Sequence, residues 1–184
     1  MKQIVLVVLF VLSIRSTVNA QEFVSPTQPV EMGKAPGMKV KLLSANSETK
    51  TYVLAFSPGD EVRSGLNEFA QTYNVKSAHY TGIGDVFFAK AGFFDYERKM
   101  FKVIPVDRAE VTSFIGNIAI FNGKAVAHTH VGAAAKDGIF HGGHLLELYE
   151  GPTLEVFVTV EPTALYIKLD TRYDAGVIDP SLEK

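Results

Sequence analysis

The spacing of apolar and polar positions predicts one helix in the first half of the chain. Apolar residues recur after Asp60 at intervals of three and four, which places them on one face of a helix. Asp60 is the expected N-cap, because its side chain can accept hydrogen bonds from the first free backbone N–H groups. The apolar stripe consists of Val62, Leu66, Phe69 and Tyr73.

Runs rich in β-branched and aromatic residues predict that much of the remaining chain forms strands. Two runs precede the helix, at residues 38–43 and 50–56, and the polar stretch between them predicts a hairpin. The pattern indicates a single compact α/β domain of α+β character, with a mainly antiparallel or mixed sheet and one main helix. The runs after the helix are 77–80, 86–94, 100–105, 109–121, 124–131, 154–160 and 164–169.

One hairpin can be worked out in register. The Asn122–Gly123 pair between two apolar runs is a strong hairpin signal, because a type I′ turn needs a positive φ at both central residues. The pairing that follows places His128 opposite Asn117. It also places His130 opposite Ile115, so that both histidines lie on the same face of the sheet.

Four of the five histidines lie in one short segment of the second half of the chain. Alternate residues of a strand share a face, so His128 and His130 can present two imidazoles side by side. The Gly142–Gly143 pair is expected to be flexible and to let the loop 132–143 fold over and bring in His144. Three imidazoles with an open fourth position indicate a divalent-metal site, with zinc as the first expectation. Nickel, copper or iron accept such ligands as well.

Each histidine also has a simpler interpretation. His128 and His130 could be polar residues on a solvated sheet face, without a metal. His141 is expected to lie near the ligand set or on the surface, and His79 to be a packed or edge residue of a strand.

The first twenty residues have the pattern of a secretory signal peptide. Lys2 precedes an apolar run at residues 4–14, and the small residue Ala20 marks a cleavage position. The run is too short to span a bilayer comfortably, since a helix needs about 20 apolar residues to do so. We therefore expect export to the periplasm or out of the cell, with cleavage near Ala20.

Composition divides the rest of the chain into three parts. Residues 21–37 are rich in proline, glycine and polar side chains and predict a flexible leader. Residues 38–170 hold the predicted helix and strands, and residues 171–184 are expected to form a C-terminal tail. The absence of cysteine excludes disulfide bonds and thiolate ligands, so the domain depends on its apolar core.

The charge balance argues against nucleic acid as a partner. The chain has 18 Lys and Arg against 20 Asp and Glu. The first twenty residues hold two of the basic side chains, Lys2 and Arg15, and no acid, so the mature part has 16 basic residues against 20 acidic ones. Tight binding to DNA draws most of its affinity from basic residues that meet phosphates. We therefore expect a different partner.

Several short motifs follow one another in a recognisable order. They are the helix led by Asp60, Tyr80–Gly84, Glu110–Asn117, His128–His130, Asp137–Gly138, Gly142–Leu145 and Glu155. Together they resemble the PPC domain (plants and prokaryotes conserved), over roughly residues 38–170. That domain occurs in stand-alone prokaryotic proteins and in plant nuclear proteins that add AT-hook motifs. The resemblance implies a compact α/β domain that assembles as a homotrimer, and it assigns a metal site to His128, His130 and His144.

Two departures from the plant members bear on function. The chain lacks the basic arm of an AT-hook, and an exported protein would be separated from the chromosome. Nucleic-acid binding by analogy with the family is therefore disfavoured here.

Three classes of function remain. The first is an exported metal-binding trimer that senses or binds a small anionic ligand. The second is a metal-dependent hydrolase or lyase, because an open three-histidine site lowers the pKa of zinc-bound water to about 7. Glu147, Asp137 and His141 are the candidates for its acid or base. The third is nucleic-acid binding. No nucleophile or cofactor motif in the sequence singles out a reaction.

A cupin is the rival fold, because its first motif also places two histidines one residue apart after a glycine, here Gly123. A cupin would normally supply a glutamate four or five residues beyond the second histidine. This chain has Ala134 and Ala135 at those positions. The PPC domain is therefore the preferred interpretation.

Overall fold

The computed structural model describes residues 20–183, so the expected signal peptide lies almost entirely outside the described residues. Within that range, no helix is both long and apolar enough to cross a membrane. The helix and strands are β1 (Phe23–Val24), β2 (Lys39–Ala45), β3 (Lys50–Phe56), α1 (Val62–Thr72), β4 (Ala78–Asp95), β5 (Met100–Phe121), β6 (Lys124–Ala135), β7 (Phe140–Val160), β8 (Ile167–Asp170) and β9 (Ala175–Ile178).

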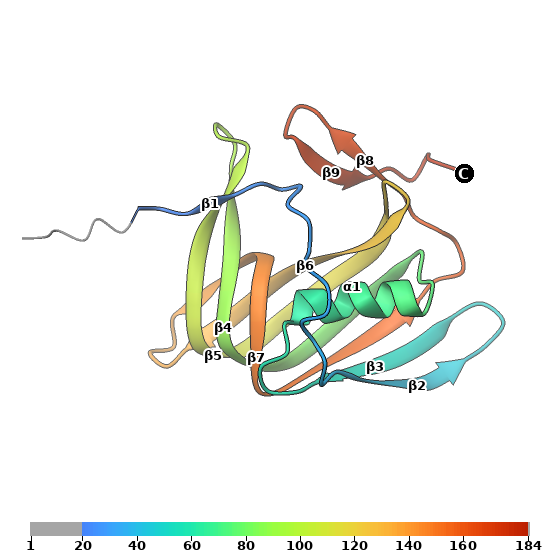
Figure 1. Ribbon diagram of the computed structural model, residues 1–184, viewed down its shortest axis with the longest axis horizontal. Coiled ribbons are helices and arrows are strands. Elements are labelled where there is room, and N and C mark those ends of the chain that lie inside the picture. The colour runs from blue at the N-terminus through green and yellow to red at the C-terminus, as the bar shows by residue number, and fades with distance from the viewer. Residues whose placement is uncertain (1–19, 184) are drawn as a thin grey trace, which may run out of the picture.

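The four longest strands, β4 to β7, form a closed ring (Figure 1). β4 pairs with β5 on one side and with β7 on the other, and β6 pairs with both β5 and β7. β3 and β2 extend the sheet beyond β7, while β1 adds to β5. Every pair in this sheet is antiparallel, as predicted. α1 packs against β6 and β7.

β7 is the strand that closes the ring. One of its edges bonds to β4, whereas three segments share the other. Residues 140–144 pair with β6, and the last residues of β7 pair with β3. Between them lies the chain at the start of α1. The backbone N–H of Glu150 donates to the carbonyl oxygen of Asp60 at 3.1 Å. That of Leu148 donates to the side chain of Glu61 at 3.0 Å.

Helix α1 is capped by Glu61, and not by Asp60 as the sequence predicts. The Glu61 carboxylate accepts hydrogen bonds from two backbone N–H groups of the first helical turn, at 2.7 and 3.2 Å. The Asp60 carboxylate accepts instead from the backbone N–H groups of Gly37 and Ser57, both at 2.9 Å. These two hydrogen bonds tie the chain before β2 to the end of β3, so the Asp60 carboxylate does not cap the helix.

The apolar stripe of α1 is buried in the core, as predicted. Val62 and Leu66 are 0% exposed and Phe69 is 1% exposed. Tyr73 lies at the end of the stripe and remains partly exposed, with its ring 5.0 Å from that of Phe69. Burial of these side chains holds α1 against β6 and β7, beyond the short stretch in which the two strands pair with each other.

Several runs that the sequence separates are continuous strands in the structure. The two runs before residue 95 both belong to β4, and the two runs between residues 100 and 121 both belong to β5. A register shift between Gly82 and Gly84 marks a β-bulge in β4. A bulge bends a strand without ending it, so β4 continues through both glycines.

The segments on either side of the predicted domain contact it. In residues 21–37, β1 pairs with β5 and the side chain of Ala35 is 4% exposed. In residues 171–184, β9 pairs with β8, so this hairpin crosses the expected boundary at residue 170. The last predicted strand, 164–169, begins only at Ile167, as β8.

Glu150 on β7 is a buried carboxyl group without a hydrogen-bond partner. Its side chain is 1% exposed, and neither carboxylate oxygen has a partner among residues 20–183. Burial raises its pKa, and the negative charges of Asp60, Asp85 and Glu155 raise it further, from the ordinary 4.5 to about 7. The folded protein therefore holds a proton there that the unfolded chain releases at lower pH.

The substitution Glu150→Gln tests this assignment. Because the folded state binds the proton more tightly, the unfolding free energy of the wild type should fall between about pH 5 and pH 8 relative to that of the variant. We expect the advantage of the variant to grow from near zero to about 3 kcal/mol over this range. Urea unfolding at several pH values measures it. Glu110→Gln, which changes an exposed carboxylate on β5, is the control. A difference that does not vary with pH would contradict the assignment.

Candidate metal centre

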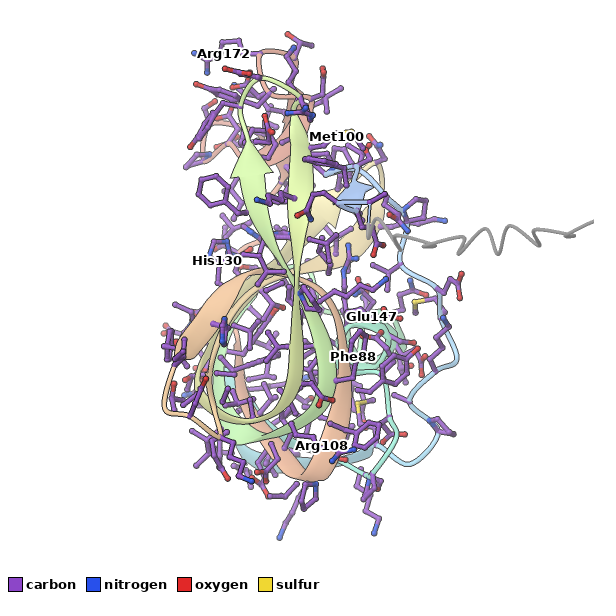
Figure 2. All side chains as sticks on the ribbon, turned by 90° about the vertical axis from the view of Figure 1, so that its left-hand side faces the viewer. Phe88, Met100, Arg108, His130, Glu147 and Arg172 are labelled. Carbon is purple, nitrogen blue, oxygen red and sulfur yellow. The ribbon has the colours of Figure 1, made fainter. Side chains whose placement is uncertain are left out.

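The structure brings the three predicted ligands together from two strands. His128 and His130 lie on β6, and His144 lies on β7. Each offers one ring nitrogen, and the three atoms lie within 4.8 Å of one another. The ring of His144 is 4.9 Å from that of His128 and 5.7 Å from that of His130, measured between centroids. Figure 2 shows His130 at the left-hand side of the molecule, about half-way up.

The hairpin register places the first two histidines as predicted. Asn122 and Gly123 have φ values of 48° and 78°, so both adopt the left-handed conformation that the tight turn requires. His128 lies opposite Asn117. His130 lies opposite Ile115 on one side and opposite His144 on the other.

The third histidine arrives by a different route from the one expected. The segment 132–143 is not a loop that folds over, because β6 continues to Ala135 and β7 begins at Phe140. The two glycines before His144 lie inside β7 and are needed for close packing. A Cβ atom on Gly143, whose φ is 149°, would lie 2.5 Å from the carbonyl oxygen of Gly92 on β4.

Neighbouring aromatic side chains hold the histidines in place. The ring of Phe101 on β5 stacks on that of His144, with centroids 4.2 Å apart and planes at 7°. The hydroxyl of Tyr80 donates to the carbonyl oxygen of His128 at 3.0 Å and lies 2.6 Å from the hydroxyl of Thr129. The strand that carries two of the candidate ligands is therefore anchored to the core.

The pKa of two of the imidazoles is lowered, which favours their neutral form. Burial lowers the pKa of His144 to about 3, and the repulsion that His128, Arg63 and His130 exert when protonated contributes further. Partial desolvation likewise lowers the pKa of His128, although its side chain is exposed at the surface, and His130 and Arg63 contribute. A neutral imidazole is the form that binds a metal, so these two residues need not lose a proton at pH 7.

The other candidates lie outside the cluster. Within residues 20–183 no carboxylate belongs to the group of converging ligand atoms. Glu147 accepts a hydrogen bond from the hydroxyl of Tyr149, and Asp137 accepts one from a backbone N–H in the β6–β7 turn. His141 pairs with Ala133 farther along that hairpin. His79 on β4 is exposed, 3.2 Å from Glu161.

Arg63 is the residue beside the cluster that the sequence pattern does not reveal. It lies in the first turn of α1, and its Nη1 atom donates to the carbonyl oxygen of Leu146 on β7 at 3.1 Å. Its charge acts on His128 and His144. In the sequence, Arg63 is simply a polar residue beside the apolar stripe of a helix, more than 60 positions from the nearest of these histidines. No local signal connects them.

Comparison with known proteins agrees with the fold. None of the proteins of curated function matches the chain. Among solved structures, a candidate DNA-binding protein from Ralstonia eutropha JMP134 is 32% identical, with a TM-score of 0.66, over 70% of this chain and 90% of that one. A PPC protein from Pyrococcus horikoshii is 28% identical, with a TM-score of 0.66, over 79% of this chain and 97% of that one.

A third structure, a metal-containing protein from Archaeoglobus fulgidus, is 28% identical, with a TM-score of 0.64, over 70% of this chain and 92% of that one. The family model of the Plants and Prokaryotes Conserved domain matches residues 43–161, a segment that contains both strands of the histidine cluster. This match covers more than half of the chain and agrees with the motif order. The chain belongs to the Plants and Prokaryotes Conserved domain family.

Proposed function

We propose that this protein binds a divalent metal ion through His128, His130 and His144 and uses the open coordination position to bind a small anionic ligand. The observation that carries the proposal is the convergence of three ring nitrogens from two hydrogen-bonded strands. Ligands on paired strands are held more firmly than ligands on loops. Zinc is the first expectation, because three imidazoles and one open position suit its tetrahedral coordination.

Further observations support a metal at this place. Burial favours the neutral form of His128 and His144, and the stacked ring of Phe101 fixes the orientation of His144. The relative from Archaeoglobus fulgidus is described as containing a metal. The anionic ligand is expected because the metal would bring positive charge to a site whose three converging ligand atoms belong to imidazoles.

A binding role has more support than the two alternatives. A hydrolase or lyase would need a general acid or base near the metal-bound water, and Glu147, Asp137 and His141 all lie outside the converging set. A relative is described as a candidate DNA-binding protein. The net charge of −2 of this chain opposes that role, as does the export that its first twenty residues predict.

A homotrimer is part of the proposal, on the strength of the family resemblance and of an exposed apolar patch beside the cluster. Thr81 on β4 lies between Ile115 on β5 and Phe157 on β7, and Ile115 lies next to His130. Ile115 is 55% exposed, Phe157 47% and the nearby Ile83 64%. Contiguous exposed apolar side chains favour burial against a partner, and a second copy of the chain is the partner we propose.

Metal content tests the site. Protein purified without a chelating tag and loaded with zinc should hold about one metal per chain, measured by elemental analysis. His144→Ala removes one of three ligands, so we expect zinc affinity to fall by at least about 100-fold. His79→Ala changes an exposed histidine outside the cluster and should leave the metal content unchanged. A wild type without metal, or an alanine variant that retains it, would exclude the proposed site.

Sedimentation velocity tests the assembly. The wild type is expected to sediment as a trimer, and Phe157→Glu, which places a charge in the exposed patch, should shift it toward the monomer. Leu169→Glu on β8 alters another exposed apolar residue, outside this patch, and serves as the control. A monomeric wild type, or a Phe157→Glu variant that sediments like the wild type, would argue against this interface.

A further inference from the structure

Arg63 is a half-buried cation without a carboxylate partner among residues 20–183. Its guanidinium makes one hydrogen bond within that range, to the carbonyl oxygen of Leu146. The nearby Glu61 carboxylate accepts hydrogen bonds from three backbone N–H groups, and its charge acts on Arg63 without forming an ion pair with it. Burial lowers the pKa of Arg63, which reflects the free energy that removal of its charge from water costs. A guanidinium carries five N–H donors, so most of them remain free for a ligand.

Arg63 lines a cavity of about 230 Å³ whose lining does not include the three histidines. The cavity lies between the N-terminal segment, the start of α1 and the facing parts of β4 and β7. Two other cations line it, and each has an acidic partner. Lys34 pairs with Glu31 at 2.5 Å. Lys90 pairs with Glu22 at 3.0 Å. Glu61 and Glu147 line the cavity as well, and Arg63 is the lining cation that forms no ion pair among the described residues.

Arg63 also stands beside the histidine cluster. The β6–β7 ladder ends at the pair of His130 and His144. Two residue pairs further along, the same register would place His128 opposite Leu146, but there the two strands have separated. The strand separation leaves the carbonyl oxygen of Leu146 without a partner on β6, and the guanidinium of Arg63 donates a hydrogen bond to it. It thus lies in the wedge between the two strands that carry the candidate ligands, and its charge reaches His128 and His144.

Asn67, one helical turn further on, fixes Arg63 in this wedge. Its side-chain amide donates to the carbonyl oxygen of Arg63 at 2.7 Å and accepts from the backbone N–H of Ala127 on β6 at 3.2 Å. α1 is thereby tied to β6 through Asn67 and to β7 through Arg63. The guanidinium is held in advance of any ligand, which reduces the entropy cost of binding one.

We infer that Arg63 is the anion-binding residue of this centre, and that its guanidinium holds a small oxyanion, a carboxylate or a phosphate group, at the edge of the metal site. The planar fork of an arginine matches two oxygens of either group. The inference rests on the proposed function, since a metal on the three histidines supplies the second contact to the ligand. It adds the class of ligand and the residue that selects it.

Calorimetric titration of acetate, oxalate and inorganic phosphate into the zinc-loaded protein tests the inference, with sodium chloride as the blank. At least one oxyanion should bind the wild type, and comparison of the three probes separates carboxylate from phosphate. Arg63→Gln should weaken that binding at least about tenfold while zinc content stays unchanged. Arg63→Lys keeps the charge but loses the fork, so an intermediate affinity is expected.

Arg172→Gln is the matched control, because Arg172 is exposed, pairs with Asp170 and lies at the top of the molecule, away from His130 (Figure 2). It should bind the oxyanion like the wild type. Equal affinity of the wild type and Arg63→Gln, or no oxyanion binding by the zinc-loaded wild type, would overturn the inference. Circular dichroism and the lysine variant distinguish the expected loss of binding in Arg63→Gln from misfolding of that variant.

Failure of the proposed function gives a different result. A wild type that takes up no zinc excludes the metal site, and the same titration of this metal-free protein still decides the role of Arg63. Oxyanion binding that Arg63→Gln abolishes would then support the anion site. Its absence would overturn that site as well.

Discussion

The structure depends on how the second edge of β7 is hydrogen-bonded. Buried backbone N–H and C=O groups must find partners, and neither β6 nor β3 reaches the middle of this long strand. The start of α1 supplies the missing groups, through Asp60, Glu61 and Arg63. The same parting of β6 and β7 leaves room at the end of their ladder, where the three histidines converge.

Sequence reasoning succeeds here where a short-range rule decides the structure. The turn at Asn122–Gly123 determines the pairing of β5 with β6 and with it the positions of His128 and His130. The stripe of α1 follows from helical spacing alone. These elements are readable because each depends on residues close to one another in the chain.

Long-range contacts explain what the sequence does not reveal. Asp60 is a residue type that commonly caps helices, but its carboxylate accepts hydrogen bonds from Gly37 and Ser57 instead. The sequence predicts that Gly143 makes the chain flexible, but a glycine is needed there because β4 approaches too closely for a side chain. Arg63 gains its role from the carbonyl oxygen of Leu146, a residue on a strand that the sequence does not place beside the helix.

The pair of His130 and His144 closes the shortest ladder of the ring, which contains five residue pairs. Fraying of a ladder begins at its ends, and this end is the one next to the wedge. An ion bound to both side chains would cross-link β6 to β7 at that point and oppose their separation. Amide hydrogens of this hairpin would then exchange with solvent more slowly in the metal-bound protein, because separation of β6 from β7 would first require release of the ion.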